Sequence, residues 1–299
     1  MYTIKQIENL TGIKAHTIRM WEQRYNFVEP RRTDTNIRYY DDRQMKKILN
    51  AALLISDGKK ISNIAKMEDS AIYNEIDTIF STTVDSDLFT SSSINRLISA
   101  SLVYDEVGFV RTYEDVIRRY GLQDAYVNVI YPLLVKVGMM WSKNELVPSQ
   151  EHFISNLLRQ KLLTAIDGID IGKTKGESWV LFLPANEHHE IGLLFCFFML
   201  RQFGEQVVYL GQNVPYENLK DVIIKAKPKN LFLFMVKFSK PQHNINYVEQ
   251  LVEDFKDVKI HISGSSVIKE NVGHVKNIHW VTEVDDLINN VLNKGGANV

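Results

Sequence analysis

The pattern of apolar and polar positions at the start of the chain predicts a short capped helix and a tight turn. Ile4, Ile7 and Leu10 recur at helical spacing, and Thr3 in front of them can cap the helix. Gly12 accepts the left-handed conformation that a tight turn between two helices needs. The first residues therefore predict a helix that ends where a second one begins.

The second helix and the segment after it complete a small motif. Over residues 14–25, Ile18 and Trp21 fall on the inward face, and a basic two-stranded wing follows at 30–40 around a polar turn at 33–36. A winged helix-turn-helix needs one helix to brace, one to enter the major groove, and basic residues to hold phosphates. A small helical hairpin with a solvated charge cluster is the alternative interpretation.

The remaining pattern changes twice along the chain. Apolar stripes from 93 to 168 predict four helices joined by short loops, as in a four-helix bundle. After residue 176, short apolar runs alternate with helices, which is typical of a parallel sheet covered on both faces. The predicted strands lie at 179–183, 206–210, 231–236, 258–263 and 278–281.

The fold class that these patterns predict is a multidomain α and α/β protein. Ligands on a doubly wound sheet bind beyond the carboxyl ends of its strands. The domains are a winged helix-turn-helix head over 1–70, a linker rich in Ser, Thr and Asp over 71–92, a four-helix-bundle cap over 93–170, and a doubly wound five-stranded parallel α/β domain over 176–299.

Charge is divided unevenly along the 299 residues. Residues 1–68 hold 13 Lys and Arg against 8 Asp and Glu, a net charge of +5, whereas the remainder holds 22 against 28, a net charge of −6. A basic head on an acidic body suits a protein that touches nucleic acid with one end only. No run of eighteen uncharged apolar residues occurs, so we expect a cytoplasmic protein without a membrane span.

Cysteine usage excludes two kinds of site. The chain has one cysteine, Cys196, and it lies inside an apolar run. A single thiol rules out an internal disulfide and a zinc site built from several cysteines. We expect Cys196 to be a small buried hydrophobic residue.

The run TIRMWEQRYNFVEPRRTDTNIRYYDD resembles the start of MerR-family transcription regulators, which carry a similar [ST]-x-R-x-W-E-x-R-Y, then a Pro-x-R, then an R-x-Y at the wing. The resemblance covers about residues 1–68. It implies that the second helix reads the major groove of a double-stranded DNA operator and that the wing grips the backbone. The DNA-binding residues implied are Lys14, His16, Thr17, Arg19, Arg24 and Tyr25 on the helix, and Arg31, Arg38 and Tyr39 on the wing.

A second group of polar residues follows the first predicted strand of the α/β domain. Glu187-His188-His189-Glu190 precedes Gly192, at the edge where a doubly wound sheet binds ligands. A His there can ligate a metal, and a Gly lets the next helix come close. Two His between two Glu are otherwise typical of a solvated helix start.

Residues 90–299 resemble the cobalamin-binding module, a helical cap followed by a Rossmann-like domain, found in corrinoid methyltransferases and cobalamin-dependent MerR-type regulators. The loop matches the family pattern Asp (or Glu)-x-His-x-x-Gly, which implies that His189 supplies the lower axial nitrogen to cobalt and that Glu187 orients its imidazole. Residues 207–215 resemble the second strand of the module and its following turn. The cofactor-binding residues implied are Trp141, Glu151 and His152 from the cap, and Glu187, His189, Gly192 and Gly264 from the Rossmann-like domain.

Three positions depart from the family pattern. The stretch 234–237 lacks the Ser of a Ser-x-Leu, and Ser263-Gly264 stands where the family has Gly-Gly. Bulky residues there would obstruct the channel for the nucleotide tail. Ser142, rather than a His, follows Trp141, so that position offers no upper ligand of this kind. A module that binds another ligand, or only a partner protein, therefore remains an alternative.

The function expected is that of a DNA-binding transcription regulator, not an enzyme. Its C-terminal module would sense a ligand, expected to be a cobalamin, and change oligomerisation or DNA binding. One head buries little surface, so we expect a homo-oligomer, and RNA polymerase or a regulatory protein is a further candidate partner. The alternatives are a ligand-free regulator whose module binds a partner protein or another small molecule, and, less favoured, a corrinoid-carrying methyl-transfer enzyme.

Overall fold

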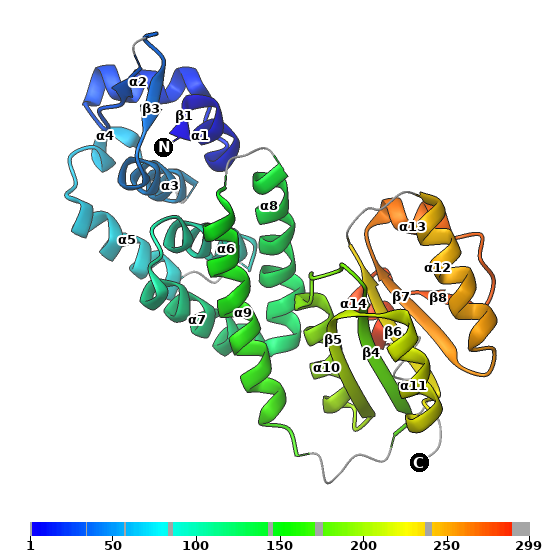
Figure 1. The fold of residues 1–299 in the computed structure, drawn as a ribbon. Coiled ribbons are helices and arrows are strands. Elements are labelled where there is room, and N and C mark those ends of the chain that lie inside the picture. The colour runs from blue at the N-terminus through cyan, green and yellow to red at the C-terminus, as the bar shows by residue number, and fades with distance from the viewer. Residues whose placement is uncertain are drawn as a thin grey trace. The chain divides into compact units, whose positions relative to one another are not determined.

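The computed structural model divides the chain into two compact units, Met1–Ile154 and Ser155–Val299. Figure 1 shows the helical first unit in blue to green and the α/β second unit in green to red. The structure describes residues 2–33, 35–56, 58–82, 86–142, 146–170, 176–236 and 241–288.

The head of the first unit is the predicted winged helix-turn-helix. Thr3 caps the first helix and forms a reciprocal capping box with Gln6, and Gly12 ends that helix at a φ of 73°. The three strands form one antiparallel sheet in the order β1-β3-β2. The elements are β1 (Tyr2–Thr3), α1 (Ile4–Thr11), α2 (Ala15–Tyr25), β2 (Arg31–Arg32), β3 (Arg38–Tyr40), α3 (Asp42–Ser56) and α4 (Ile61–Ile64).

The core of the head forms where the apolar spacing places it. Ile7, Ile18 and Trp21 are all buried, so Trp21 is part of the core. The ring of Trp21 meets that of Phe27 edge to face, with 5.9 Å between the centroids. The inward faces of α1 and α2 were therefore correctly predicted.

The segment 71–92, which we predicted to be a linker, is helical in its described part. It falls on α5 (Asp69–Thr82) and the start of α6 (Ser86–Leu102), and residues 83–85 between them lie outside the described part of the chain. The helical spacing of its apolar residues outweighs the weak local preference of its Ser, Thr and Asp residues. Ile72, for example, is 2 % exposed.

Four helical segments follow, as in the predicted bundle. They are α6, α7 (Glu106–Ala125), η1 with α8 (Tyr126–Ile130 and Tyr131–Ser142), and α9 (Pro148–Asp167). Gly121 interrupts α7 with a φ of 73°. The turn η1 is a π-helix that ends at Ile130, two residues before Pro132.

The second unit contains a five-stranded parallel sheet in the order β5-β4-β6-β7-β8. This is the doubly wound 2-1-3-4-5 order, whose switch point lies between the first and third strands. The strands match the five predicted runs, and α13 was not predicted. The elements are β4 (Ser178–Pro184), α10 (Ile191–Gln202), β5 (Gln206–Val214), α11 (Tyr216–Ala226), β6 (Asn230–Met235), α12 (Pro241–Asp254), β7 (Lys259–Gly264), α13 (Ser266–Val272), β8 (Ile278–Trp280) and α14 (Val284–Asp286).

Helices cover this sheet and define its core. Phe182, Leu231 and Ile262 belong to one buried cluster with residues of α11, α12 and α13. Helix α10 carries eight buried residues, Cys196 among them, as expected for a helix that is apolar on most of its faces. Helix α14 begins at Val284, and residues 289–299 lie outside the described part of the chain.

Within the described ranges, no helix combines the length and the apolar character needed to span a membrane.

Candidate functional site

The basic residues singled out on the head lie on one helix and its wing. Lys14, the N-cap residue of α2, is exposed. On α2 itself, His16, Arg19 and Arg24 are exposed, and Thr17 and Tyr25 are partly exposed. On the wing, Arg31 is exposed, and Arg38 and Tyr39 are partly exposed. A helix with this distribution can present polar and cationic side chains to base edges and phosphates.

The wing is fixed to α2 through Glu22. The Arg38 Nε donates to Glu22 Oε2 at 3.0 Å, and the hydroxyl of Tyr40 donates to Glu22 Oε1. The Glu22 side chain is 8 % exposed. Its two partners offset the cost of removing its charge from water. Burial, followed by the Glu22 carboxylate, raises the pKa of Tyr40 well above its ordinary value. Sequence reasoning missed Glu22, although it stands in the family-like W-E-x-R-Y run.

Two further predicted DNA contacts have partners in the head. The Lys14 Nζ lies 3.2 Å from Glu8 Oε1, and the pairing lowers the pKa of the Glu8 carboxyl. The Arg24 guanidinium lies 5.6 Å from the centroid of the Tyr25 ring. Such exposed pairs are worth little and are easily exchanged for phosphate contacts.

In the second unit, the loop between β4 and α10 is built around Glu187, which is buried. Its Oε1 accepts from the backbone N–H groups of His188 at 2.9 Å and His189 at 3.1 Å, and from His189 Nδ1 at 2.5 Å. Its Oε2 accepts from the backbone N–H of Val236, directly after β6, at 2.8 Å. One carboxylate therefore joins the β4 loop to the end of β6, at the switch point of the sheet.

The hydrogen bond to Glu187 fixes the tautomer of His189. A carboxylate can only accept, so Nδ1 of His189 carries the proton, and Nε2 bears the lone pair of the neutral imidazole. The His189 side chain is 60 % exposed. An outward imidazole whose other nitrogen is fixed by a carboxylate is the usual arrangement of a metal-ligating histidine.

The ring of the neighbouring His188 has a different partner. Its Nδ1 lies 3.2 Å from Gln212 Oε1, and the backbone N–H of Asn186 donates to Asn213 Oδ1 at 2.8 Å. These contacts fasten the loop to the end of β5. His188 and His189 are thus distinguishable: only His189 bonds Glu187 through its ring.

Glu190 is a further buried carboxylate, and sequence analysis assigned it no role. Its Oε1 accepts from Arg159 Nε on α9, and its Oε2 accepts from the Tyr209 hydroxyl at 3.2 Å. Burial and the Glu190 carboxylate raise the pKa of Tyr209 above its ordinary value. The ring of Phe197 stacks on Tyr209 with 4.9 Å between centroids. This group holds the start of α10 directly after His189.

The two glycines of the predicted cofactor set have different surroundings. A Cβ on Gly192 would lie 2.6 Å from Cζ of Phe234, so the glycine gives room to that ring. A Cβ on Gly264 would lie 1.9 Å from the carbonyl oxygen of Met235 on β6. Phe234 stands in the stretch that lacks the family's Ser, and Lys237 of that stretch lies outside the described residues. The loop thus fits an axial ligand, whereas a nucleotide tail would compete with the Phe234 ring.

The predicted cap residues belong to the first unit. Trp141, near the end of α8, is 56 % exposed, an unusual position for a large indole. The Nδ1 of His152 lies 2.8 Å from Glu151 Oε2 at the start of α9, and the His152 side chain is 69 % exposed. The side chain of Ser142 and residues 143–145 lie outside what the structure describes.

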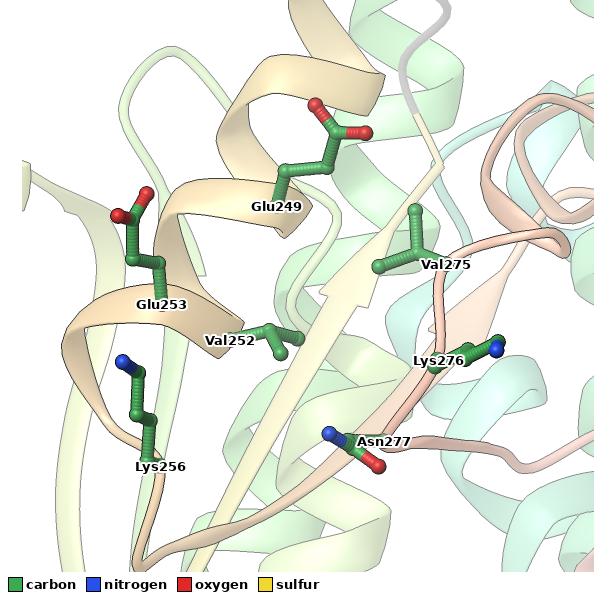
Figure 2. Close-up of a pocket in the computed structure, with 7 residues that line it drawn as sticks. All are labelled: Glu249, Val252, Glu253, Lys256, Val275, Lys276 and Asn277. Atoms are coloured by element: carbon green, nitrogen blue, oxygen red, sulfur yellow. The ribbon is translucent and has the colours of Figure 1, made fainter.

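A hollow of about 310 Å³ lies between α12 and the turn before β8. Figure 2 shows the side chains that line it. Glu249, Glu253, Lys256 and Lys276 rim it, and Val252 forms part of its apolar lining. The hollow lies at the amino ends of β7 and β8, the opposite edge of the parallel sheet from the His189 loop. Its mixed exposed charges point to no ligand class.

Comparison with known proteins gives one family match for the head and another for the helical cap. Residues 2–71 match the family "MerR HTH family regulatory protein", and residues 93–164 match "B12 binding domain". The transcriptional repressor CarH of Myxococcus xanthus is 29% identical over 229 residues, 76% of each chain. The repressor CarA of the same organism is 27% identical over 251 residues, 82% of this chain and 80% of its own.

A solved structure supports the fold. The monomethylamine corrinoid protein of Methanosarcina barkeri superposes with a TM-score of 0.57 at 16% identity, covering 69% of this chain and 99% of its own. At that identity the likeness concerns architecture alone, whereas the two long sequence relatives are named as repressors and not as enzymes. The chain is therefore a DNA-binding transcription regulator that joins a MerR helix-turn-helix domain to a B12-binding domain, and it is a homologue of CarH and CarA.

Proposed function

We propose that this protein is a cobalamin-responsive repressor, in which α2 and the wing bind operator DNA and His189 provides the lower axial ligand to cobalt. The hydrogen bond from His189 Nδ1 to the buried Glu187 is the observation that carries the cofactor part. It sets the imidazole tautomer that a metal requires. A bound cobalamin would supply a cobalt centre with a coordination position for that nitrogen.

The residues proposed to bind the cofactor have different roles. Glu187 holds the loop and the imidazole, while Trp141, Glu151 and His152 of the cap are proposed to contact the upper side of the corrin. Gly264 lets the backbone after β7 lie close to β6, at the edge of the sheet where the ligand would bind. None of these assignments requires a chemical step, because the proposed role is sensing.

The proposed DNA-binding residues are Lys14, His16, Thr17, Arg19, Arg24 and Tyr25 on α2, with Arg31, Arg38 and Tyr39 on the wing. Glu22 limits how far Arg38 can move, because it accepts a hydrogen bond from the Arg38 Nε. We propose that the outer guanidinium nitrogens of Arg38 face a phosphate. We further propose a homo-oligomer on a two-fold symmetric operator in the cytoplasm, with RNA polymerase or a regulatory protein as a further partner.

The first prediction concerns Arg19. Replacing Arg19 with alanine should weaken operator binding about ten-fold, because an exposed guanidinium on a groove-reading helix makes a contact worth roughly 1–3 kcal/mol. Fluorescence anisotropy with a duplex selected by the wild-type protein would measure this. Arg111→Ala, which removes an exposed arginine of α7, is the matched control and should bind normally. Equal affinities of both variants would contradict the docking of α2 in the groove.

The second prediction concerns His189. After incubation with hydroxocobalamin and desalting, His189→Ala should lose the corrin absorption of the wild type or show a shifted spectrum, because the axial nitrogen is missing. His188→Ala is the matched control and should keep the wild-type spectrum, since His188 bonds Gln212 instead. A spectrum and an affinity that do not change in His189→Ala would show that another group faces cobalt.

A second candidate function is supported by Phe234. Its ring packs against Gly192, where a cobalamin tail would need space. A regulator whose module binds a partner protein or a smaller ligand would keep this packing. A wild-type protein that stays colourless after hydroxocobalamin treatment and still binds DNA would favour this alternative.

A further inference from the structure

Gln150, in the first turn of α9, is buried, with 5 % of its surface exposed. Its side-chain amide makes three hydrogen bonds. Its Nε2 donates to the backbone oxygen of Leu102 at 3.0 Å and to the hydroxyl of Tyr2 at 3.3 Å. Its Oε1 accepts from the backbone N–H of Val147 at 3.2 Å. One amide therefore ties together the end of α6, the start of α9 and the first strand of the head.

Tyr2 continues this connection into the wing. It is 5 % exposed, and in the antiparallel β1–β3 pair it stands opposite Tyr40. The hydroxyl of Tyr40 donates to Glu22 on α2, and Glu22 also accepts from Arg38. Hydrogen bonds and strand pairing thus run without a break from the bundle to the wing and the groove-reading helix.

A second contact supports the same interface between head and bundle. Helix α3 packs against α6, and Lys46 Nζ lies 3.8 Å from Asp105 Oδ2. Asp105 also caps α7 by accepting from the backbone N–H of Gly108 at 2.9 Å. The bundle therefore contacts the head through both β1 and α3.

This interface does not cover the basic surface. The side chains of Lys14, His16, Arg19 and Arg31 remain exposed while the head lies on the bundle. The docked head is thus open to DNA, and the interface fixes the orientation of the wing without blocking it. Loss of the interface should therefore weaken DNA binding.

We propose that Gln150 is a positioning residue for DNA binding: it holds β1, and through β1 the wing strand β3, in the orientation that the operator requires. This inference rests on the proposed DNA-binding function. Glu151 and His152, the next two residues of α9, are those proposed to contact the cofactor, so the same helical turn carries both assignments.

A double-mutant cycle on the full chain without corrinoid tests the proposal. The probe is the duplex selected by the wild type, and the readout is its affinity. Tyr2→Phe removes only the hydroxyl and should weaken binding about five-fold, the effect of one net hydrogen bond of about 1 kcal/mol. Gln150→Ala should weaken it at least as much, and the double variant should be no weaker than Gln150→Ala alone.

Two further measurements separate positioning from folding. Hydrogen exchange of residues 38–40 should rise in both single variants, while thermal unfolding shows that each is folded at the assay temperature. Gln160→Ala, which changes an exposed glutamine of the same helix, is the matched control and should bind normally. Folded variants with wild-type affinity, or strictly additive effects, would overturn the role of Gln150. A wild-type protein that selects no duplex would instead overturn the DNA-binding function itself.

Discussion

Replacing Gly264 with alanine should destabilise the α/β unit by at least about 3 kcal/mol, the scale of a severe backbone clash. The added Cβ would lie 1.9 Å from the carbonyl oxygen of Met235, and that oxygen belongs to the backbone of a central strand. The φ of 147° at Gly264 is also one that other residues rarely adopt. Neither the strand nor the turn can relieve the overlap by rotating a side chain.

Urea unfolding of the full chain, followed by hydrogen exchange of peptides from β6 and β7, would measure this loss. Gly138→Ala is the matched control, because a Cβ on Gly138 of α8 meets no atom within 4 Å. That change should be neutral or stabilise α8 by up to about 1 kcal/mol. If Gly264→Ala unfolded at the same urea concentration as Gly138→Ala, the close approach of β6 and β7 would be wrong.

Acid should destabilise the same unit through His261 on β7. This residue is 7 % exposed, and burial, followed by the nearby His279 and Lys259, lowers its pKa to about 3. The folded protein therefore favours neutral His261, whereas the unfolded chain binds the proton near pH 6.5. Stability is full above that pH and should fall by about 1.4 kcal/mol per unit as the pH drops toward the folded pKa.

The surroundings of His261 explain why its protonated form is disfavoured in the folded protein. Its Nε2 lies 3.2 Å from Asn230 Oδ1, whose amide nitrogen donates to Glu177 at 2.8 Å. Its ring lies 5.0 Å from that of Trp179 and 5.4 Å from that of His279, centroid to centroid. Within the part of the chain that the structure describes, Nδ1 of His261 has no hydrogen-bond partner. Glu177 and, beside His279, Asp286 are the acidic groups nearby, and their raising effect is smaller than that of burial.

The measurement is the dependence of unfolding free energy on pH in the wild type and in His261→Phe. Between pH 6 and pH 4 the wild type should lose about 2–3 kcal/mol more than the variant, which cannot bind this proton. His274→Gln, a change of an exposed histidine, should follow the wild type. Parallel curves for the wild type and His261→Phe would show that His261 does not cause the loss of stability at low pH.

The elements that the sequence predicted well are those with a strong period. The runs of the two central strands β4 and β6 are apolar and almost wholly buried because both faces of the sheet are covered there, and α1 and α2 follow their spacing to Ile7, Ile18 and Trp21. Helix α5 lies in the segment that was predicted as a linker from its Ser, Thr and Asp content, although Ile72 packs inward.

The site was predictable only where one residue could be matched to a pattern. The pairing of Glu187 with His189 was implied by the resemblance of the loop to the pattern Asp (or Glu)-x-His-x-x-Gly, and the two side chains are in contact. Glu22, Gln150 and Arg159 were not assigned, because their partners lie 16 or more residues away in the sequence and pairing at that separation leaves no periodic trace. Gly192 of α10 was predicted, but the ring that fills the space beside it belongs to Phe234 on strand β6.

The hydrogen bonds of Glu187 have a consequence for the energetics of binding. Both carboxylate oxygens already accept from the loop backbone, from the His189 ring and from Val236. The loop is thus ordered before any ligand arrives, and its conformational entropy is lost on folding instead of on association. A calorimetric titration should therefore show a smaller unfavourable entropy for the wild type than for Glu187→Ala, whose loop would have to become ordered during binding.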